Sequence, residues 1–216
     1  DFYEMFFDDA VTASRELELV LTGRACGQEE RAPMCGVPFH SADSYMARLV
    51  AKGYKVAICE QMEDPALAKG LVKREVVRVL TPGTVIENSM LNEGRNNFLA
   101  SVYFTGESAG VCFIDVSTGS VNLTELAAPA LPDKIINEIG RFMPSEIVFN
   151  SASSSLTKEF SFISNKTEAL AQELGDDYFD PQSSAEIILK HFKKDSLSEL
   201  ELNETGAAVP ALGAAL

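Results

Sequence analysis

Several patterns that define whole classes of protein are missing from this 216-residue sequence. No run approaches the roughly 18 apolar residues that a membrane span needs, and no basic segment followed by an apolar one marks a signal peptide. The phosphate-binding sequence G-x-x-x-x-G-K-[ST] is also absent, so we expect no nucleotide-binding loop in this chain. The chain opens abruptly on Asp1 and stops inside an alanine-rich segment, and we interpret it as part of a longer protein.

Patterns typical of metal sites and disulfides are equally sparse. The chain has only two histidines and four cysteines, which form no C-x-x-C pair. A structural zinc site needs four suitably spaced ligands, and a disulfide framework is improbable with so few cysteines in a chain of this size. We therefore expect reduced thiols in a cytoplasmic protein. Cys59 is interpreted as a small buried thiol at a strand end, because no motif ties a histidine to it as a catalytic partner.

Basic residues are outnumbered by acidic ones, and the net charge of −14 argues at first against nucleic-acid binding. The imbalance is uneven, however. Residues 1–84 hold 10 Lys and Arg against 13 Asp and Glu, whereas residues 85–216 hold 8 against 19. We therefore expect any DNA contact in the first part, weak binding by this chain alone, and protein contacts in the second part.

The residues that are present have the balance of a folded protein. Hydrophobic residues make up 46% and charged residues 23% of the chain, as in ordinary globular domains. A chain of this length is comfortable for two domains, and the turn-forming sequence Thr-Pro-Gly-Thr at residues 81–84 marks a boundary. We therefore predict an α/β protein with domains at residues 1–82 and 83–216.

Short helices and strands alternate in the first domain, which predicts a small mixed α/β fold. Residues 2–7 are expected to form the end of a strand with Phe6 and Phe7 in the core, and a helix is expected to begin at the acidic pair that follows. Residues 23–38 contain three glycines and two prolines, which predicts a loop.

A second helix is expected after Ser41, whose side chain is suited to capping it. Its apolar residues recur at i, i+3, i+4 and i+7, and Gly53 ends it where a left-handed residue is needed. Alternating apolar residues then predict strands at residues 54–59 and 75–80. The apolar stripe of the helix consists of Ala42, Tyr45, Met46 and Leu49.

The second domain is predicted to begin with three strands, at residues 97–105, 110–116 and 120–126, the last two joined by a tight turn. A helix that starts at Pro132 and a strand at residues 146–149 follow. The buried stripe of this helix is expected to consist of Ile135, Ile136, Ile139 and Phe142.

After a serine-rich connection at residues 151–155, a further helix is expected at about residues 183–193, with Ile187, Ile188 and Phe192 facing inward. Three antiparallel strands, a helix and another strand follow the order of ribonuclease H-like folds. We therefore expect that fold for the second domain.

Four motifs of the first domain resemble one known family in their order and spacing. They are Asp-Phe-Tyr-Glu-Met-Phe at residues 1–6, Pro-Met-Cys-Gly-Val-Pro-Phe-His at 33–40, Val-Ala-Ile-Cys-Glu-Gln at 56–61 and Val-Arg-Val-Leu-Thr-Pro-Gly-Thr at 77–84. Together they resemble the MutS mismatch repair proteins. The second domain is more loosely similar, best at residues 113–119, and would be the connector domain of that family.

The resemblance implies how the chain contacts DNA. In the family, the phenylalanine of a Phe-x-Glu segment enters the minor groove and stacks on a mispaired or unpaired base while the duplex kinks. Phe2 and Glu4 stand at the matching positions, and alternation along a strand places them on one face. Ionised, Glu4 accepts a hydrogen bond from a base imino group; protonated, it donates one to a purine N7. Without the surrounding motifs, a strand phenylalanine would usually be a core residue.

Further DNA contacts are expected in the same domain. Pro33 and Met34, in the predicted loop, either line the minor groove beside Phe2 or pack on their own domain. Four basic residues are candidate phosphate contacts, which supply salt-dependent affinity without sequence preference, and a solvated basic face explains them equally well. These four are Arg24, Lys69, Arg74 and Arg78.

For the intact protein, the resemblance implies an ATPase that uses ATP and Mg²⁺, with the nucleotide site beyond this chain. It also implies a homodimer in which one subunit inserts the wedge, and a connector that relays the nucleotide state and contacts the partner protein MutL. This chain itself is expected to be no enzyme and to need no cofactor. Its partner is expected to be mismatched or looped double-stranded DNA, and no membrane.

Two other functions fit parts of the sequence. Ribonuclease H-like nucleases bind two metal ions through strand carboxylates, and Asp115 is the candidate for that role. The predicted strand at residues 97–105 has no carboxylate, however, and the adjoining turn explains Asp115 as a turn-flanking residue. The second alternative is an interaction protein of a recombination-associated family branch, which lacks the wedge pair; Phe2 and Glu4 argue against it.

Overall fold

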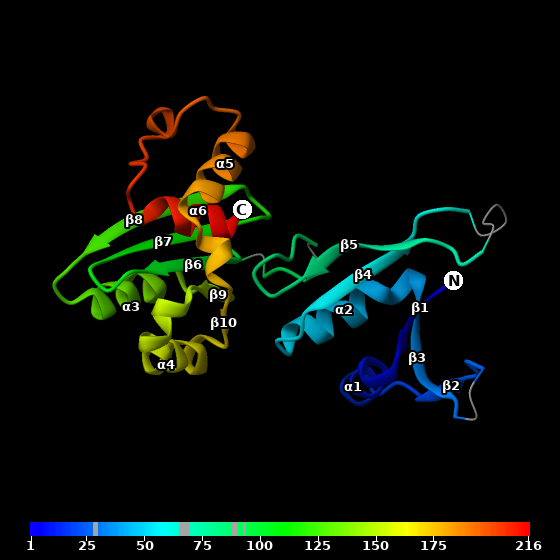
Figure 1. Cartoon of the computed structure of the whole chain (residues 1–216). Coiled ribbons are helices and arrows are strands. Elements are labelled where there is room, and N and C mark those ends of the chain that lie inside the picture. Colours follow the sequence, from blue (N-terminus) through cyan, green and yellow to red (C-terminus); the bar gives the residue numbers. More distant parts are fainter. Residues whose placement is uncertain (28–29, 65–69, 88–89, 93) are drawn as a thin grey trace. The chain divides into compact units, whose positions relative to one another are not determined.

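The computed structural model describes residues 1–27, 30–64, 70–87, 90–92 and 94–216. The described chain divides into two compact units, Asp1–Thr81 and Pro82–Leu216 (Figure 1). None of the helices within these ranges is long and apolar enough to cross a membrane.

A three-stranded antiparallel sheet forms the first part of the N-terminal unit. Its order is β1 (Phe2–Phe6), β3 (Ala32–Pro38) and β2 (Thr22–Arg24), so that β3 is the central strand. Helix α1 (Phe7–Leu17) packs against the sheet and begins with the predicted acidic first turn. The core between them contains Ala10, Ala13, Leu17, Cys35 and Leu49.

A short turn of 3-10 helix, η1 (Phe39–Ser41), leads into α2 (Ala42–Ala51). An antiparallel hairpin of β4 (Val56–Gln61) and β5 (Arg74–Leu80) follows. The predicted end of the second helix is confirmed, because Gly53 has a φ of +82° and donates its N–H to Val50.

The predicted loop at residues 23–38 is wrong, because most of it is β-structure. Pairing of β3 with β1 ends at Met34. Pro33 lies just beyond this pairing, where the side of β3 that faces β1 no longer needs the backbone N–H that proline lacks. Gly36 lies in the middle of the strand, where a Cβ would approach the backbone oxygen of Tyr3 to 3.1 Å. The glycine therefore serves close packing within the sheet and not a turn.

Three side chains of this unit differ from their predictions. Phe7 is 63% exposed, because the chain turns sharply there with a φ of +54° and directs the ring outward. The hydroxyl of Ser41 donates to the carbonyl of Pro38 at 3.3 Å instead of capping α2. Cys59 is exposed, since it lies in the middle of β4 on the outer side of the hairpin.

The C-terminal unit is built on a five-stranded sheet with the order β10-β9-β6-β7-β8. Strands β6 (Leu99–Phe104), β7 (Ser108–Asp115) and β8 (Ser120–Ala127) are antiparallel neighbours. Strand β9 (Glu146–Phe149) runs parallel to β6, and β10 (Leu170–Glu173) runs parallel to β9. This arrangement confirms the predicted ribonuclease H-like order of three antiparallel strands, a helix and a strand.

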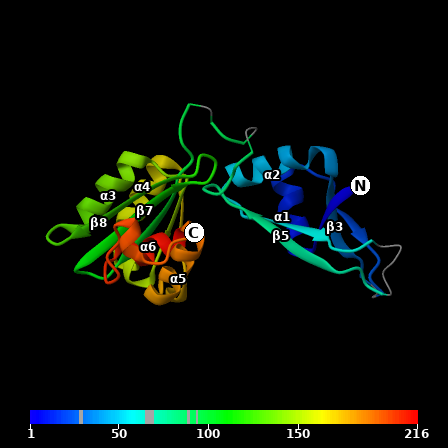
Figure 2. The same ribbon diagram turned by 90° about the horizontal axis from the view of Figure 1, so that it is seen from above.

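Helices cover both faces of this sheet, as Figures 1 and 2 show. One layer consists of α3 (Leu131–Phe142) and α4 (Thr157–Thr167), and the other of α5 (Pro181–Phe192) and α6 (Ala208–Ala215). Short 3-10 helices lie between these elements: η2 (Ser151–Leu156), η3 (Asp176–Phe179) and η4 (Leu197–Leu200).

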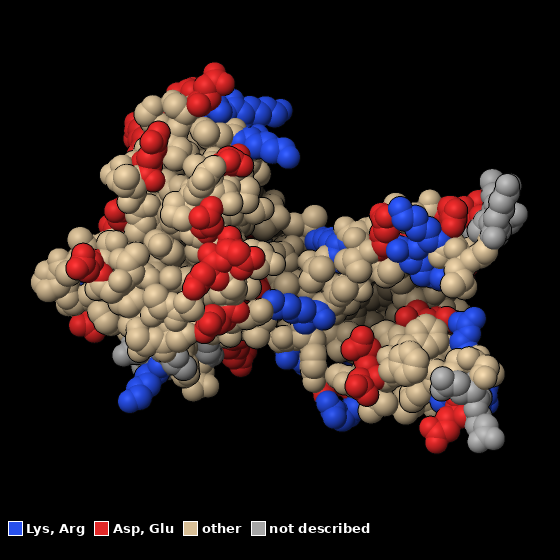
Figure 3. Space-filling model, in the orientation of Figure 1, with Lys and Arg blue, Asp and Glu red and all other residues tan. Residues whose placement is uncertain are grey.

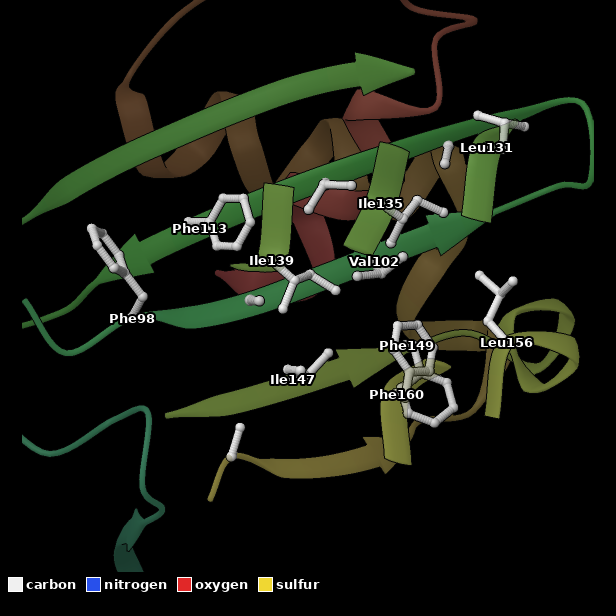
Figure 4. Close-up of a cluster of buried hydrophobic side chains, with 14 residues drawn as sticks. Phe98, Val102, Phe113, Leu131, Ile135, Ile139, Ile147, Phe149, Leu156 and Phe160 are labelled. Atoms are coloured by element: carbon white, nitrogen blue, oxygen red, sulfur yellow. The ribbon is translucent and has the colours of Figure 1, made fainter. Parts of the chain in front are cut away.

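Strand β7 supplies both layers of the core, because successive side chains point to opposite faces. Phe113 lies in the cluster under α3 and α4, which Figure 4 shows, while Cys112 lies in the cluster under α5 and α6. The apolar stripe predicted for α3 is confirmed. Ile135 and Ile139 are fully buried, and Ile136 and Phe142 pack against the same cluster. Apolar runs buried on both faces are typical of central strands in such sheets.

Parts of the C-terminal prediction are wrong. Ile188 is fully buried but its neighbour Ile187 is 44% exposed, because consecutive helical residues point about 100° apart. The serine-rich segment at residues 151–155 is no loose connection, since it forms η2 and leads directly into α4. Helix α4 and the four-residue strand β10 were both absent from the sequence prediction, and the short strand offered too few residues for an alternation pattern.

The Thr-Pro-Gly-Thr segment is tied to the C-terminal unit by a buried carboxylate. The N–H of Gly83 donates to Oε2 of Glu146 at 3.0 Å, and Glu146 is only 3% exposed. A Cβ on Gly83 would lie 2.9 Å from the Cβ of Glu146 and 3.0 Å from that of Leu99. Only glycine fits this approach without displacement, which explains a residue that the sequence showed only as part of a turn.

The tight packing of Gly110 against Ala207 predicts that two glycine-to-alanine variants differ in stability. A Cβ on Gly110 would lie 2.0 Å from the backbone oxygen of Ala207, so Gly110→Ala should lower the free energy of unfolding by about 3 kcal/mol or more. Gly140→Ala is the matched control, because Gly140 is exposed on α3 with open space around it, and alanine there should stabilise by about 0.5–1 kcal/mol. Urea unfolding of both variants measures the effect, and equal stabilities would contradict the packing described.

Candidate nucleic-acid interface

Strand register places a set of exposed and half-buried residues on one face of the N-terminal sheet. Phe6 is one of them, so its predicted place in the core is wrong. In an antiparallel pair, directly opposite residues share a face, and β1 pairs Phe2 with Pro38, Glu4 with Gly36 and Phe6 with Met34. Strand β2 adds residues to the same face through its pairing with Met34. We call this surface the open face: Phe2, Glu4, Phe6, Thr22, Arg24, Met34, Gly36 and Pro38.

Phe2 is the most prominent apolar side chain of the open face. Its ring is 65% exposed although it lies in a strand, which makes it no part of the core. The backbone beside it is held, because the N–H of Phe39 donates to the carbonyl of Asp1 at 3.1 Å. Gly36 leaves space under the two functional candidates, since a Cβ there would lie 3.8 Å from both Phe2 and Glu4 side chains.

Glu4 forms an ion pair across the open face. Its Oε2 accepts a hydrogen bond from Nη1 of Arg24 at 2.6 Å. The guanidinium of Arg24 also lies 6.0 Å from the centre of the Phe6 ring, within reach of a cation–π contact. The open face therefore presents an exposed aromatic ring beside a charge-neutral pair of polar side chains.

The opposite face of β1 anchors the strand. Tyr3 stacks on Phe39 with ring centres 5.6 Å apart, and its hydroxyl donates to the carboxylate of Glu60 on β4. The hydrogen bond to Glu60, together with burial and nearby negative charge, raises the pKa of Tyr3 to about 12. Met5 packs on the core beside it. Tyr3 therefore serves packing and not the exposed surface.

Of the predicted contact residues, the structure brings together Phe2, Glu4, Arg24 and Met34. Pro33 lies on the opposite face, because it pairs with Gly23 one residue away from Met34. Lys69 lies outside the described residues.

The other two predicted arginines belong to the β4–β5 hairpin, apart from the open face. A register shift between Ile58 and Cys59 places Arg78 opposite Ile58, while Arg74 lies opposite Gln61. Because of this bulge, Arg74 and Arg78 point to opposite sides of the hairpin. Figure 3 shows basic and acidic side chains mixed over the visible face of the N-terminal unit, with no continuous basic patch there.

The sequence analysis missed the structural roles of three residues that shape this region: Gly36, Glu60 and Arg24. Gly36 was assigned to a loop because of the glycines and prolines around it, although it lies within β3. Glu60 was visible only as part of a motif, since its bond to Tyr3 joins positions 57 residues apart. Arg24 was predicted to contact phosphate. Its ion pair with Glu4 depends on β2, a strand that was not predicted.

Asp115, the alternative catalytic residue, is fully buried at the end of β7. Its Oδ1 accepts hydrogen bonds from the N–H and hydroxyl of Ser117 and from the N–H of Thr118, while Oδ2 accepts from the side chain of Asn96 and the N–H of Asn97. Burial raises the pKa of Asp115, but the bonds from Ser117, Asn96 and Asn97 outweigh it and hold the pKa below its usual value.

Those bonds give Asp115 a structural role in the turn between β7 and β8. Both carboxylate oxygens already have partners, which leaves little capacity for a metal ion. Within the described ranges, no three His, Cys, Asp or Glu side chains lie close enough to hold one. The nuclease alternative is therefore not favoured.

Asp115→Asn should lower the free energy of unfolding by roughly 1–3 kcal/mol at neutral pH, because buried donors lose a charged acceptor. Since the folded-state pKa is lowered, this stabilisation is present above the unfolded-state pKa of about 3.9 and is lost as pH falls through the folded-state pKa. The difference between wild type and variant should therefore shrink in acid. Urea unfolding at pH values from neutral to acidic tests this, with exposed Asp195→Asn as the control for the charge change. A difference that stays constant with pH would contradict it.

Comparison with known proteins gives the same assignment for both units. The family model described as MutS domain I matches residues 1–89, and that described as MutS domain II matches residues 97–216. Among solved structures, Thermus thermophilus RuvC in complex with a Holliday junction substrate covers 56% of this chain and 90% of its own at 7% identity, with a TM-score of 0.42. We infer nothing from a likeness at that level.

Curated relatives are similar over nearly the whole chain. The DNA mismatch repair protein MutS of Ruminiclostridium cellulolyticum is 50% identical over 100% of this chain and 24% of its own length. Those of Lachnoclostridium phytofermentans and Acetivibrio thermocellus are 47% and 48% identical, over 100% and 98% of this chain and 23% and 25% of their own lengths. The chain thus spans about a quarter of the length of these relatives. It belongs to the MutS family of DNA mismatch repair proteins, of which it carries domains I and II.

Proposed function

We propose that the N-terminal unit binds mismatched or looped double-stranded DNA through its open face, with Phe2 as a wedge and Glu4 as its hydrogen-bonding neighbour. The observation that carries this proposal is the 65% exposed ring of Phe2, held at the end of a strand beside a carboxylate. An aromatic ring held in this way can stack on a base.

Energetics support a wedge that tests deformability. Inserting an apolar side chain unstacks a base step at a cost of a few kcal/mol, and a mispaired base has already lost part of that stacking. An aromatic face recovers roughly 1–3 kcal/mol by stacking on any base. Phe2 can therefore serve many mismatches, because the discrimination comes from the DNA and not from base-edge chemistry.

Glu4 adds a hydrogen bond to the base on which Phe2 stacks. The two side chains share the open face, and Gly36 lies opposite Glu4 on the central strand. As a carboxylate, Glu4 accepts from an imino N–H; in its protonated form it donates to a purine N7. Met34 and Arg24 lie on the same face. In this proposal Met34 contacts the groove beside the wedge, and Arg24 contacts phosphate.

The C-terminal unit acts as a connector in this proposal. It carries most of the acidic excess, with 19 Asp and Glu against 8 Lys and Arg in residues 85–216, which suits contact with protein better than with DNA. It would relay the nucleotide state between the ATPase of the intact protein and the DNA-binding unit, and would present a surface to MutL. The intact protein would use ATP and Mg²⁺ and act as a homodimer. The protein would work in the cytoplasm.

Replacing Phe2 by alanine tests the wedge directly. In the intact protein, Phe2→Ala should reduce the preference for a duplex with a G·T pair or an unpaired T over a fully paired duplex by about 10-fold or more, because stacking worth roughly 1–3 kcal/mol is lost. Weak, salt-sensitive binding to both duplexes should remain. Competition binding with the two duplexes measures the preference.

Phe7→Ala is the matched control for this experiment. Phe7 is 63% exposed, nearly the same as Phe2, but it begins α1 and lies outside the open face. The control should keep the mismatch preference. If Phe2→Ala keeps it too, the wedge assignment is wrong, and the family membership describes the fold of this unit but not its mode of binding.

A further inference from the structure

The ion pair between Glu4 and Arg24 occupies the carboxylate that the proposed function assigns to a DNA base. Oε2 of Glu4 accepts from Nη1 of Arg24 at 2.6 Å, a short charge-assisted hydrogen bond. Among the described residues, Oε1 of Glu4 has no donor, and the other N–H groups of Arg24 have no acceptor. Each partner therefore keeps capacity for a second contact.

Strand register shows that this pair bridges the whole sheet. Arg24 on β2 lies opposite Ala32, and Glu4 on β1 lies opposite Gly36, four residues further along the central strand. To meet Glu4, the Arg24 side chain extends along the open face past the Phe6 ring, 6.0 Å from its centre. Gly36 adds no side chain to that path.

The pair is also exposed enough to open. Side-chain exposure is 60% for Arg24 and 38% for Glu4, and ion pairs at such positions contribute little net stability. DNA brings an alternative partner for each member. Phosphate oxygens match the planar guanidinium of Arg24, and an unstacked base offers Glu4 a donor or an acceptor.

We propose that Glu4 and Arg24 exchange partners when the open face meets a mismatch. Glu4 turns from the guanidinium to the base on which Phe2 stacks, and Arg24 turns to a backbone phosphate. On fully paired DNA, the base stays stacked and offers Glu4 nothing, so the ion pair stays closed. Arg24 is then a specificity-determining residue that senses the mismatch through Glu4, an inference that rests on the proposed function.

Partner exchange makes the contact between Arg24 and a phosphate conditional on the mismatch. The phosphate contact of Arg24 then forms only in the complex where Glu4 has left. The exchange thus converts a positioning contact, which normally carries no sequence information, into one that depends on the state of the base pair.

The salt dependence of binding separates this exchange from an ordinary phosphate contact. The intact protein is titrated with a G·T duplex and with a fully paired duplex over a range of salt concentrations. Arg24→Gln should lower the slope of log K against log salt by about 1 on the mismatched duplex and leave it unchanged on the paired duplex. The preference for the mismatch should fall several-fold at low salt.

A second variant tests the coupling to Glu4. In a Glu4→Gln background the ion pair is absent, so Arg24 is available to phosphate on both duplexes. Adding Arg24→Gln to that background should lower the salt slope equally on both. Arg15→Gln is the matched control, because Arg15 forms an exposed ion pair with its neighbour Glu16 on α1, away from the open face. It should leave the difference in slope between the two duplexes unchanged.

Each other outcome overturns the inference. Equal loss of slope on both duplexes with Glu4 intact would make Arg24 an ordinary phosphate contact. No change on either duplex would show that the ion pair stays closed on DNA. A wild-type protein without any mismatch preference would instead overturn the proposed function, and the exchange with it, so the two failures are distinguishable.

Discussion

The pairing of β1 with β3 is the interaction on which the N-terminal unit depends. Its register decides which side chains of a five-residue strand face solvent and which face the core. A slip by one residue would turn Phe2 and Glu4 inward and expose Tyr3 and Met5. The inward residues prevent that slip, because the stacking of Tyr3 and its bond to Glu60 are available in one register only. Exposed chemistry on one side of the strand is therefore secured by packing on the other.

The sheets of the two units are buried to different extents. The C-terminal unit buries its sheet on both faces, so that central strands such as β7 contribute side chains to two helix layers. Among the described residues, the N-terminal sheet packs on the core through one face, and its open face is left for a ligand. An uncovered face of this kind has a cost in exposed apolar surface, and Phe2 carries much of it.

The sequence predicted well where local patterns and packing agree. Alternation at residues 54–59 and 75–80 identified the β4–β5 hairpin, and the tight turn between β7 and β8 and the stripe of α3 identified part of the C-terminal sheet and its first helix. The Phe-x-Glu motif identified the exposed pair of β1. Prediction was wrong where glycine and proline serve packing instead of turns, as in β3. It was also wrong where contacts join distant segments. The bond from Tyr3 to Glu60 and the ion pair of Arg24 depend on strand register, which no local pattern reveals.

The hydrogen bonds around Asp115 also bear on how this fold can change in evolution. Two-metal nucleases hold their ions with acidic side chains, so an acid at a strand end looks like a starting point for catalysis. Here the carboxylate braces the turn after β7 through five donors from Ser117, Thr118, Asn96 and Asn97. Recruiting it for metal chemistry would mean dismantling that turn before any activity was gained. A change of role at this position therefore begins with a loss of stability.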